Sequence, residues 1–140
     1  MRQFSNKLAL NIFYRLPVIA FCIFIFWQSS YSGIISEPLF PYDDKVLHFA
    51  AYALLAFLAA RDLIAEKPLW SLTKIKIIAI LFSSFYGLSD EMHQAFVSQR
   101  YASAWDLLAD CAGSVAGCLV YTKFASRKLF WMEKYFNKKI

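Results

Sequence analysis

The sequence predicts an all-α fold: an integral membrane bundle of four transmembrane helices with a basic amphipathic helix at its C-terminal end. Three observations predict this fold. Hydrophobic residues make up 59% of the 140 residues, compared with roughly 45–50% in ordinary soluble domains. Four segments contain the roughly 20 mostly apolar residues that a helix needs to cross a bilayer. Connections rich in Lys and Arg alternate with connections that are poor in them.

The chain is expected to form a single membrane domain over residues 1–140. Its predicted spans are residues 16–32, 46–65, 77–96 and 104–124, and residues 125–140 form a cytoplasmic tail. We expect the first span to be retained and not removed as a secretory signal, because the bulky Trp27 and Gln28 lie where cleavage requires small residues. In the tail, basic residues alternate with aromatic ones, which is typical of a helix on a membrane surface.

The basic residues predict the orientation of the chain. They lie before the first span, between the second and third spans and after the fourth span, whereas the other two loops contain only Lys45 and Arg100. Basic loops stay in the cytoplasm, so both termini are expected there, and loops 33–44 and 97–103 are expected to face outward. The net charge of +5 is thereby explained by topology, and no nucleic-acid partner is expected.

Polar residues are confined to the outer ends of three spans. Lys45 directly precedes the second span, in which His48 and Tyr52 lie four residues apart on one helix face. The fourth span carries Asp106 and Asp110, followed on the same face by Gly113 and Gly117, a spacing that permits close helix packing. The third span contributes the largest group within two helical turns: Asp90, Glu91, His93 and Gln94.

These groups are predicted to meet in one layer. At 1.5 Å per residue, Asp90 and Asp110 both lie about 9 Å below the outer boundary, and Tyr52 reaches nearly the same depth. A charged side chain within the bilayer costs roughly 2.5–3.5 kcal/mol, so such residues usually line a cavity and carry function. Arg100 and Lys45 are expected at the mouth of this cavity. The predicted binding residues are Lys45, His48, Tyr52, Asp90, Glu91, His93, Gln94, Arg100, Asp106 and Asp110.

The chemistry of this layer leaves alternatives open. His48 or His93 with Asp90 is a candidate catalytic acid–base pair. The same polar groups are also compatible with simple hydrogen bonding between helices. We expect no metal and no other cofactor, because D-E-x-H differs from the H-E-x-x-H zinc motif. The three cysteines, which lie within spans and form no metal-binding pair, are interpreted as packing residues: Cys22, Cys111 and Cys118.

Several motifs resemble the VanZ-like family of small bacterial membrane proteins, named for a teicoplanin-resistance protein. They are F-W-Q-S-S at 26–30, D-K-V-L-H-F-A-A-Y at 44–52, Y-G-L-S-D-E-M-H-Q-A-F-V at 86–97, Arg100, and D-L-L-A-D-C-A-G-S-V-A-G at 106–117. Two positions depart from the family pattern. Ser98 and Gln99 replace a common Pro-Gly pair, and Asp110 replaces a common Asn.

The resemblance implies a multi-pass protein of the bacterial cytoplasmic membrane, associated with the cell envelope and teicoplanin resistance. Combined with the polar layer, it favours an outward-facing pocket in contact with membrane lipids. The expected ligand is a lipid-linked envelope precursor or a glycopeptide. A membrane enzyme with a His/Asp acid–base pair and a structural or assembly partner are the alternatives.

Overall fold

The computed structural model describes residues 8–31, 42–98 and 100–137, with side chains described as far as residue 126. A short π-helical turn, η1 (Asn11–Arg15), runs directly into α2 (Leu16–Ser29). The chain then forms α3 (Asp43–Glu66), α4 (Leu72–Gln94) and α5 (Ala104–Asn137), and no strand occurs in this part of the chain. The predicted all-α class is confirmed.

Four helical stretches are long and apolar enough to cross a membrane: Leu8–Ser29, Asp43–Glu66, Leu72–Gln94 and Ala104–Ser126. The predicted four-span fold is therefore confirmed. The first stretch begins eight residues before the predicted start at residue 16, because the mostly apolar residues before Arg15 continue the helix. The third ends two residues before the predicted residue 96, where the chain turns toward α5.

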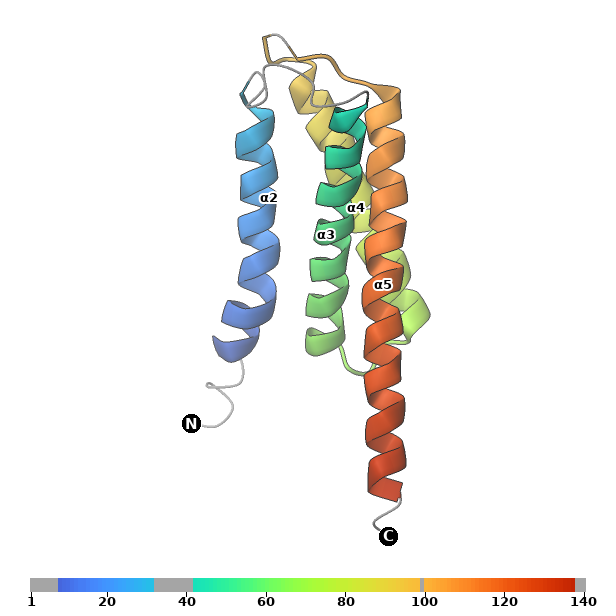
Figure 1. The fold of residues 1–140 in the computed structure, drawn as a ribbon. Coiled ribbons are helices and arrows are strands. Elements are labelled where there is room, and N and C mark those ends of the chain that lie inside the picture. The colour runs from blue at the N-terminus through green and yellow to red at the C-terminus, as the bar shows by residue number, and fades with distance from the viewer. Residues whose placement is uncertain (1–7, 32–41, 99, 138–140) are drawn as a thin grey trace.

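The helices run up and down along one direction (Figure 1). The end of α2, the start of α3, the end of α4 and the start of α5 lie at one end of the bundle, which we call the site end. The connection between α3 and α4 lies toward the opposite end, where the first helix also begins. The site end is the end that contains the predicted polar layer.

Helices α3 and α5 pack with almost no space between their backbones. A Cβ atom on Gly113 would collide with the carbonyl oxygen of Phe49, and a Cβ atom on Gly117 would collide with that of Ala53. This confirms the predicted glycine contact, which allows helices to approach closely within a membrane. Small buried side chains complete the core between α3, α4 and α5, among them Ala56, Ala60, Ala79 and Cys118.

Helix α2 is attached to this three-helix core through a second apolar cluster and a few polar contacts. Val18 and Ile25 of α2 pack in a cluster with Tyr52 and Leu55 of α3. The Tyr86 hydroxyl of α4 donates a hydrogen bond of 2.7 Å to the Cys22 carbonyl. Large apolar side chains remain exposed on every span, for example Phe24, Leu54, Leu81, Phe85 and Leu119. Such extensive apolar surface is expected where helices face lipid.

Helix α5 continues past the bundle as one helix (Figure 1). The predicted tail segment is helical as far as Asn137, but it prolongs the fourth span and does not turn away from it. The physical reason is local: no Gly or Pro follows Gly117, so nothing in the sequence interrupts the helix between these two elements.

Candidate functional site

Three helices bring a histidine and two carboxyl groups together at the site end. The Nδ1 atom of His48 in α3 lies 2.9 Å from Oδ1 of Asp110 in α5. The same nitrogen lies 3.8 Å from Oε1 of Glu91 in α4. Asp110 is fully buried and Glu91 is 5% exposed, so both carboxyl groups are removed from bulk water. We call His48, Glu91 and Asp110 the His–acid cluster.

The surrounding backbone holds the Glu91 carboxyl group and leaves room for that of Asp110. The Ser103 backbone N–H donates a 2.8 Å hydrogen bond to Oε2 of Glu91, so the turn before α5 holds one side of this carboxyl group. Gly87 faces Asp110: a Cβ atom at position 87 would lie 2.8 Å from Oδ2 of Asp110. The space for the Asp110 carboxyl group therefore exists because residue 87 has no side chain.

Lys45 forms a separate ionic group next to the cluster. Its ammonium nitrogen lies 2.8 Å from Oδ2 of Asp44 and 3.0 Å from Oδ1 of Asp106. This places the predicted residue Asp106 beside a positive charge. The amino end of α3 is thereby tied to the amino end of α5.

Three further predicted polar residues of α3 and α4 are buried near these groups: Tyr52, Asp90 and Gln94. Gln94 donates a 3.2 Å hydrogen bond to Oδ2 of Asp90, one helical turn away. The Tyr52 hydroxyl is buried without a hydrogen-bond partner among the described residues. Below them, Ser114 donates to Ser83 at 2.9 Å and links α5 to α4. These contacts form a polar layer that crosses the bundle.

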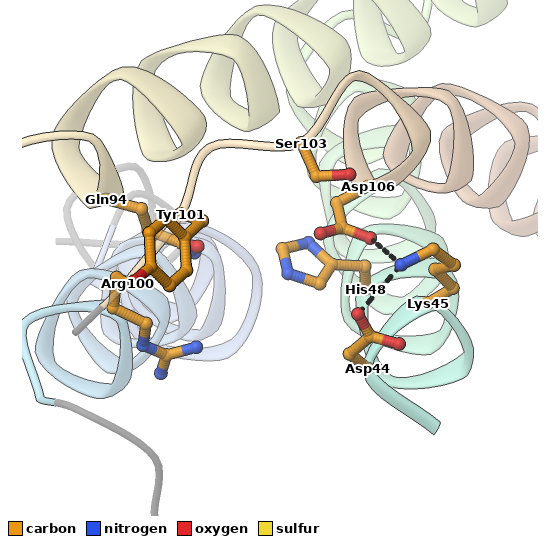
Figure 2. Close-up of a pocket in the computed structure, with 8 residues that line it drawn as sticks. All are labelled: Asp44, Lys45, His48, Gln94, Arg100, Tyr101, Ser103 and Asp106. Atoms are coloured by element: carbon orange, nitrogen blue, oxygen red, sulfur yellow. Dashed lines mark hydrogen bonds and ion pairs between the residues drawn. The ribbon is translucent and has the colours of Figure 1, made fainter. Parts of the chain in front are cut away.

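A pocket of about 310 Å³ opens at this end of the bundle (Figure 2). Gln94, Arg100 and Tyr101 lie on one side of it, and Lys45, His48 and Asp106 lie on the other. Asp44 and Ser103 complete the lining. His48 is the member of the His–acid cluster that lines this pocket, so it connects the buried acids to the space outside.

Two predicted site residues are directed toward α2. Arg100 donates hydrogen bonds of 3.0 Å to the Tyr31 carbonyl and 3.2 Å to the Gln28 carbonyl. Gln28 lies in the last turn of α2, where carbonyls have no partner four residues further along the helix, and Tyr31 lies just beyond the end of α2. His93 lies 3.0 Å from the Ser30 hydroxyl, measured at Nε2, and its ring packs on Phe26 at 4.7 Å between centroids. Arg100 still lines the pocket, whereas His93 does not.

The arrangement of the cluster permits metal coordination as well as proton transfer. One donor atom each from His48, Glu91 and Asp110 lies within 4.8 Å of the other two. From the sequence we expected no metal, because D-E-x-H differs from the H-E-x-x-H zinc motif. The three residues lie on three different helices, where no local spacing reveals them as a set. Sequence reasoning also omitted Gly87 and Ser103 from the site. Gly87 lies one turn before Glu91 on the same helix, but its role depends on Asp110 of α5.

A comparison with protein-family models identifies the family of the chain. The family model described as VanZ/LLP1 matches residues 3–127, which is nearly the whole chain. The chain belongs to the VanZ/LLP1 family. No curated protein and no solved structure shows a significant match to it. This match confirms the resemblance seen in the sequence. In this VanZ/LLP1 protein, the motifs that carry His48, Glu91 and Asp110 come together at the site end.

Proposed function

We propose that this VanZ/LLP1 protein binds the polar headgroup of a lipid-linked envelope precursor, or of a lipophilic glycopeptide, in the pocket at the site end. The observation that carries the proposal is the pocket lined by Lys45, His48 and Arg100 at the end of membrane-spanning helices. An amphiphile bound there would place its headgroup among polar side chains and its tail along exposed apolar helix surface.

The two fixed cations of the pocket retain unused hydrogen-bond donors. An ammonium group has three N–H donors, and the Lys45 ammonium group directs two of them to the carboxyl groups of Asp44 and Asp106. A guanidinium group has five, and Arg100 uses two of them on carbonyls at the end of α2. Both side chains are therefore held in position while donors remain for a phosphate or carboxylate group. This supports recognition of an anionic part of the headgroup.

The proposed orientation places the site on the extracytoplasmic side of the cytoplasmic membrane. Basic residues are abundant in residues 61–76, which comprise the end of α3, the connection and the start of α4 at the other end of the bundle, and they are scarce at the site end. The positive-inside rule then places the α3–α4 connection in the cytoplasm and the pocket outside. Envelope precursors and glycopeptides are both present on that side.

Binding of a fluorescent polyprenyl phosphate and of labelled teicoplanin to the full chain in nanodiscs tests the proposal. Lys45→Gln and Arg100→Gln should each weaken binding by roughly 5- to 100-fold, because each removes a charged hydrogen-bond donor. Lys67→Gln is the matched control, since Lys67 is a partly exposed lysine beyond the end of α3 at the opposite end of the bundle. Equal binding by all variants, or no binding of either probe by the unchanged chain, would refute the proposal.

A specific observation also favours an enzyme acting on an envelope lipid. His48 lines the pocket, and its Nδ1 faces the Asp110 carboxyl group at 2.9 Å. A carboxyl group in this position orients an imidazole and favours proton transfer through its other nitrogen. His48 would then act as the general acid or base, and its carboxyl partner would be Asp110 in place of Asp90, the partner named in the pair predicted from the sequence. Turnover of a lipid substrate by the unchanged chain, lost in His48→Gln with binding retained, would support this function over binding alone.

The polar layer also favours a structural or assembly role. Ser83 donates to the Tyr52 carbonyl at 3.2 Å and accepts from Ser114, so one serine links three helices. If this is the whole function of the layer, Asp90→Asn, His48→Ala and Arg100→Ala should all impair folding in detergent. Folded variants that lose only ligand binding would exclude a purely structural role.

A further inference from the structure

We infer that His48, Glu91 and Asp110 form a binding site for one divalent transition-metal ion of the Mn²⁺ or Zn²⁺ class. The Nδ1 atom of His48 lies 2.9 Å from Oδ1 of Asp110 and 3.8 Å from Oε1 of Glu91. Donors at about 2.1 Å from one metal ion are separated by roughly 3.0–3.4 Å, so small side-chain shifts bring all three atoms to ligand distance. The three donors come from three helices, and the donor atoms all lie within 4.8 Å of one another.

Buried carboxyl oxygens that lack a hydrogen-bond donor point to a cation at this position. Oε1 of Glu91 and Oδ2 of Asp110 have no hydrogen-bond partner among the described residues, and each atom is inaccessible to solvent. Glu91 and Asp110 are 5% and 0% exposed. A carboxyl oxygen removed from water without a compensating partner is energetically unfavourable, and a bound cation satisfies it.

The fixed cations nearby do not fulfil this role. The ion pairs of Lys45 are with Asp44 and Asp106, and the described hydrogen bonds of the Arg100 guanidinium are with carbonyls of Gln28 and Tyr31. Within the described residues, the ion pairs of Glu91 and Asp110 are with His48 alone. A shared imidazole carries at most one positive charge for two acids, and a divalent ion matches the pair.

The donor set selects the class of metal. One imidazole nitrogen with two carboxylate oxygens suits Mn²⁺, Fe²⁺ or Zn²⁺, whereas Ca²⁺ and Mg²⁺ prefer oxygen donors alone. His48 lines the pocket, so an ion held here would have an open side for water or for an oxygen of a bound molecule. The backbone hydrogen bond from Ser103 to Glu91 supplies the kind of outer contact that orients a ligating carboxylate.

Metal binding by the full chain tests this inference without any lipid ligand. The protein is purified in detergent through a tag without histidine, stripped with a chelator and titrated with Mn²⁺ while free Mn²⁺ is followed by electron paramagnetic resonance. Mn²⁺ is the preferred probe because it binds cysteine thiols poorly. We expect one saturable site, at least tenfold weaker in His48→Ala and Glu91→Gln. Zn²⁺ should raise the melting temperature of the unchanged chain but not that of Glu91→Gln.

His93→Ala is the matched control. The chain has two histidines. His93 contacts Phe26 in α2 and Ser30 at the end of α2, away from the His–acid cluster. Its removal should leave the stoichiometry and affinity unchanged. Glu91→Gln preserves the size of the side chain, so it keeps the test decisive if His48→Ala fails to fold. Absence of saturable binding by the unchanged chain, or equal affinity in Glu91→Gln, would overturn the inference while leaving the headgroup proposal intact.

Discussion

His48 and Asp110 lie 62 residues apart in the chain, yet Nδ1 of one and Oδ1 of the other are separated by 2.9 Å. Because α3 and α5 run in contact along Gly113 and Gly117, this pair is held at the site end of a tightly packed interface. Asp110 is fully buried, and His48 lines the pocket. The pair therefore links the packing of the bundle to the chemistry of its surface.

The energetic coupling of this pair can be measured directly. Changing His48 to Ala leaves a buried carboxyl group without its partner, and we expect a loss of about 1–3 kcal/mol in the free energy of unfolding. Asp110→Asn alone should cost less, because the amide retains a hydrogen-bonding oxygen. In the double variant the effects should fall short of additivity by about 0.5–3 kcal/mol. Unfolding in mixed micelles by a denaturing detergent provides the measurement, and strict additivity would contradict direct coupling.

Gly117→Ala should destabilise the bundle. A methyl group there meets the Ala53 backbone, which cannot move aside as a flexible side chain would, so α3 and α5 must separate. Overpacking of this kind typically costs about 1–3 kcal/mol. Thermal unfolding in detergent should reveal a lower midpoint. Ala112→Leu on the exposed face of the same helix is the control and should unfold at the midpoint of the unchanged chain.

Gly87→Ala should damage the site more than the fold. The added Cβ would lie 2.8 Å from Oδ2 and 2.9 Å from Cβ of Asp110, so the Asp110 carboxyl group has to shift. We expect Mn²⁺ affinity to fall by roughly 10- to 100-fold, the range seen when groups around a metal are perturbed. Ser84→Ala, one turn away on α4, should bind as the unchanged chain does. A Gly87→Ala protein with unchanged affinity would show that the Asp110 position is not critical.

Arg100→Gln should loosen the end of α2. The Arg100 guanidinium donates hydrogen bonds to the Gln28 and Tyr31 carbonyls and so connects the chain before α5 to the end of α2. Glutamine is too short and has too few donors to replace it. Hydrogen–deuterium exchange should rise at the last turn of α2 while the core of α3 and α5 stays protected. Lys123→Gln, far from this turn on α5, serves as the control.

The proposed orientation predicts opposite labelling of the two ends of the bundle. Tyr101 is 87% exposed at the site end, and Leu69 is 97% exposed in the connection between α3 and α4. In a background with the native cysteines replaced by serine, Tyr101→Cys should react with a membrane-impermeant thiol reagent added to intact cells. Leu69→Cys should react only after the membrane is opened. The reverse pattern would place the pocket in the cytoplasm.

The helical spans, and the gathering of polar residues at one end of the bundle, were predictable because both depend on properties read along a single helix. Apolar length identifies a span, and the positions of Asp90 and Asp110 near the ends of their helices follow from counting residues. The direction in which a polar side chain points was not predictable in the same way. His93 is only three residues from Asp90, yet it contacts Ser30 because it lies on the side of α4 that faces α2. The continuous α5 was likewise missed, since the change from apolar to basic sequence marks a change of environment and not an end of the helix.

The amino-acid sequence by itself determined the membrane class, the four helices, the glycine contact and the family of this protein. Each of these follows from local composition or from short motifs. Only the tertiary structure decided which acid partners His48, that Lys45 pairs with Asp106, and that Arg100 holds the end of α2. The physical reason is that these contacts join different helices, so they depend on the rotation and spacing of whole helices, which packing fixes and no single segment encodes.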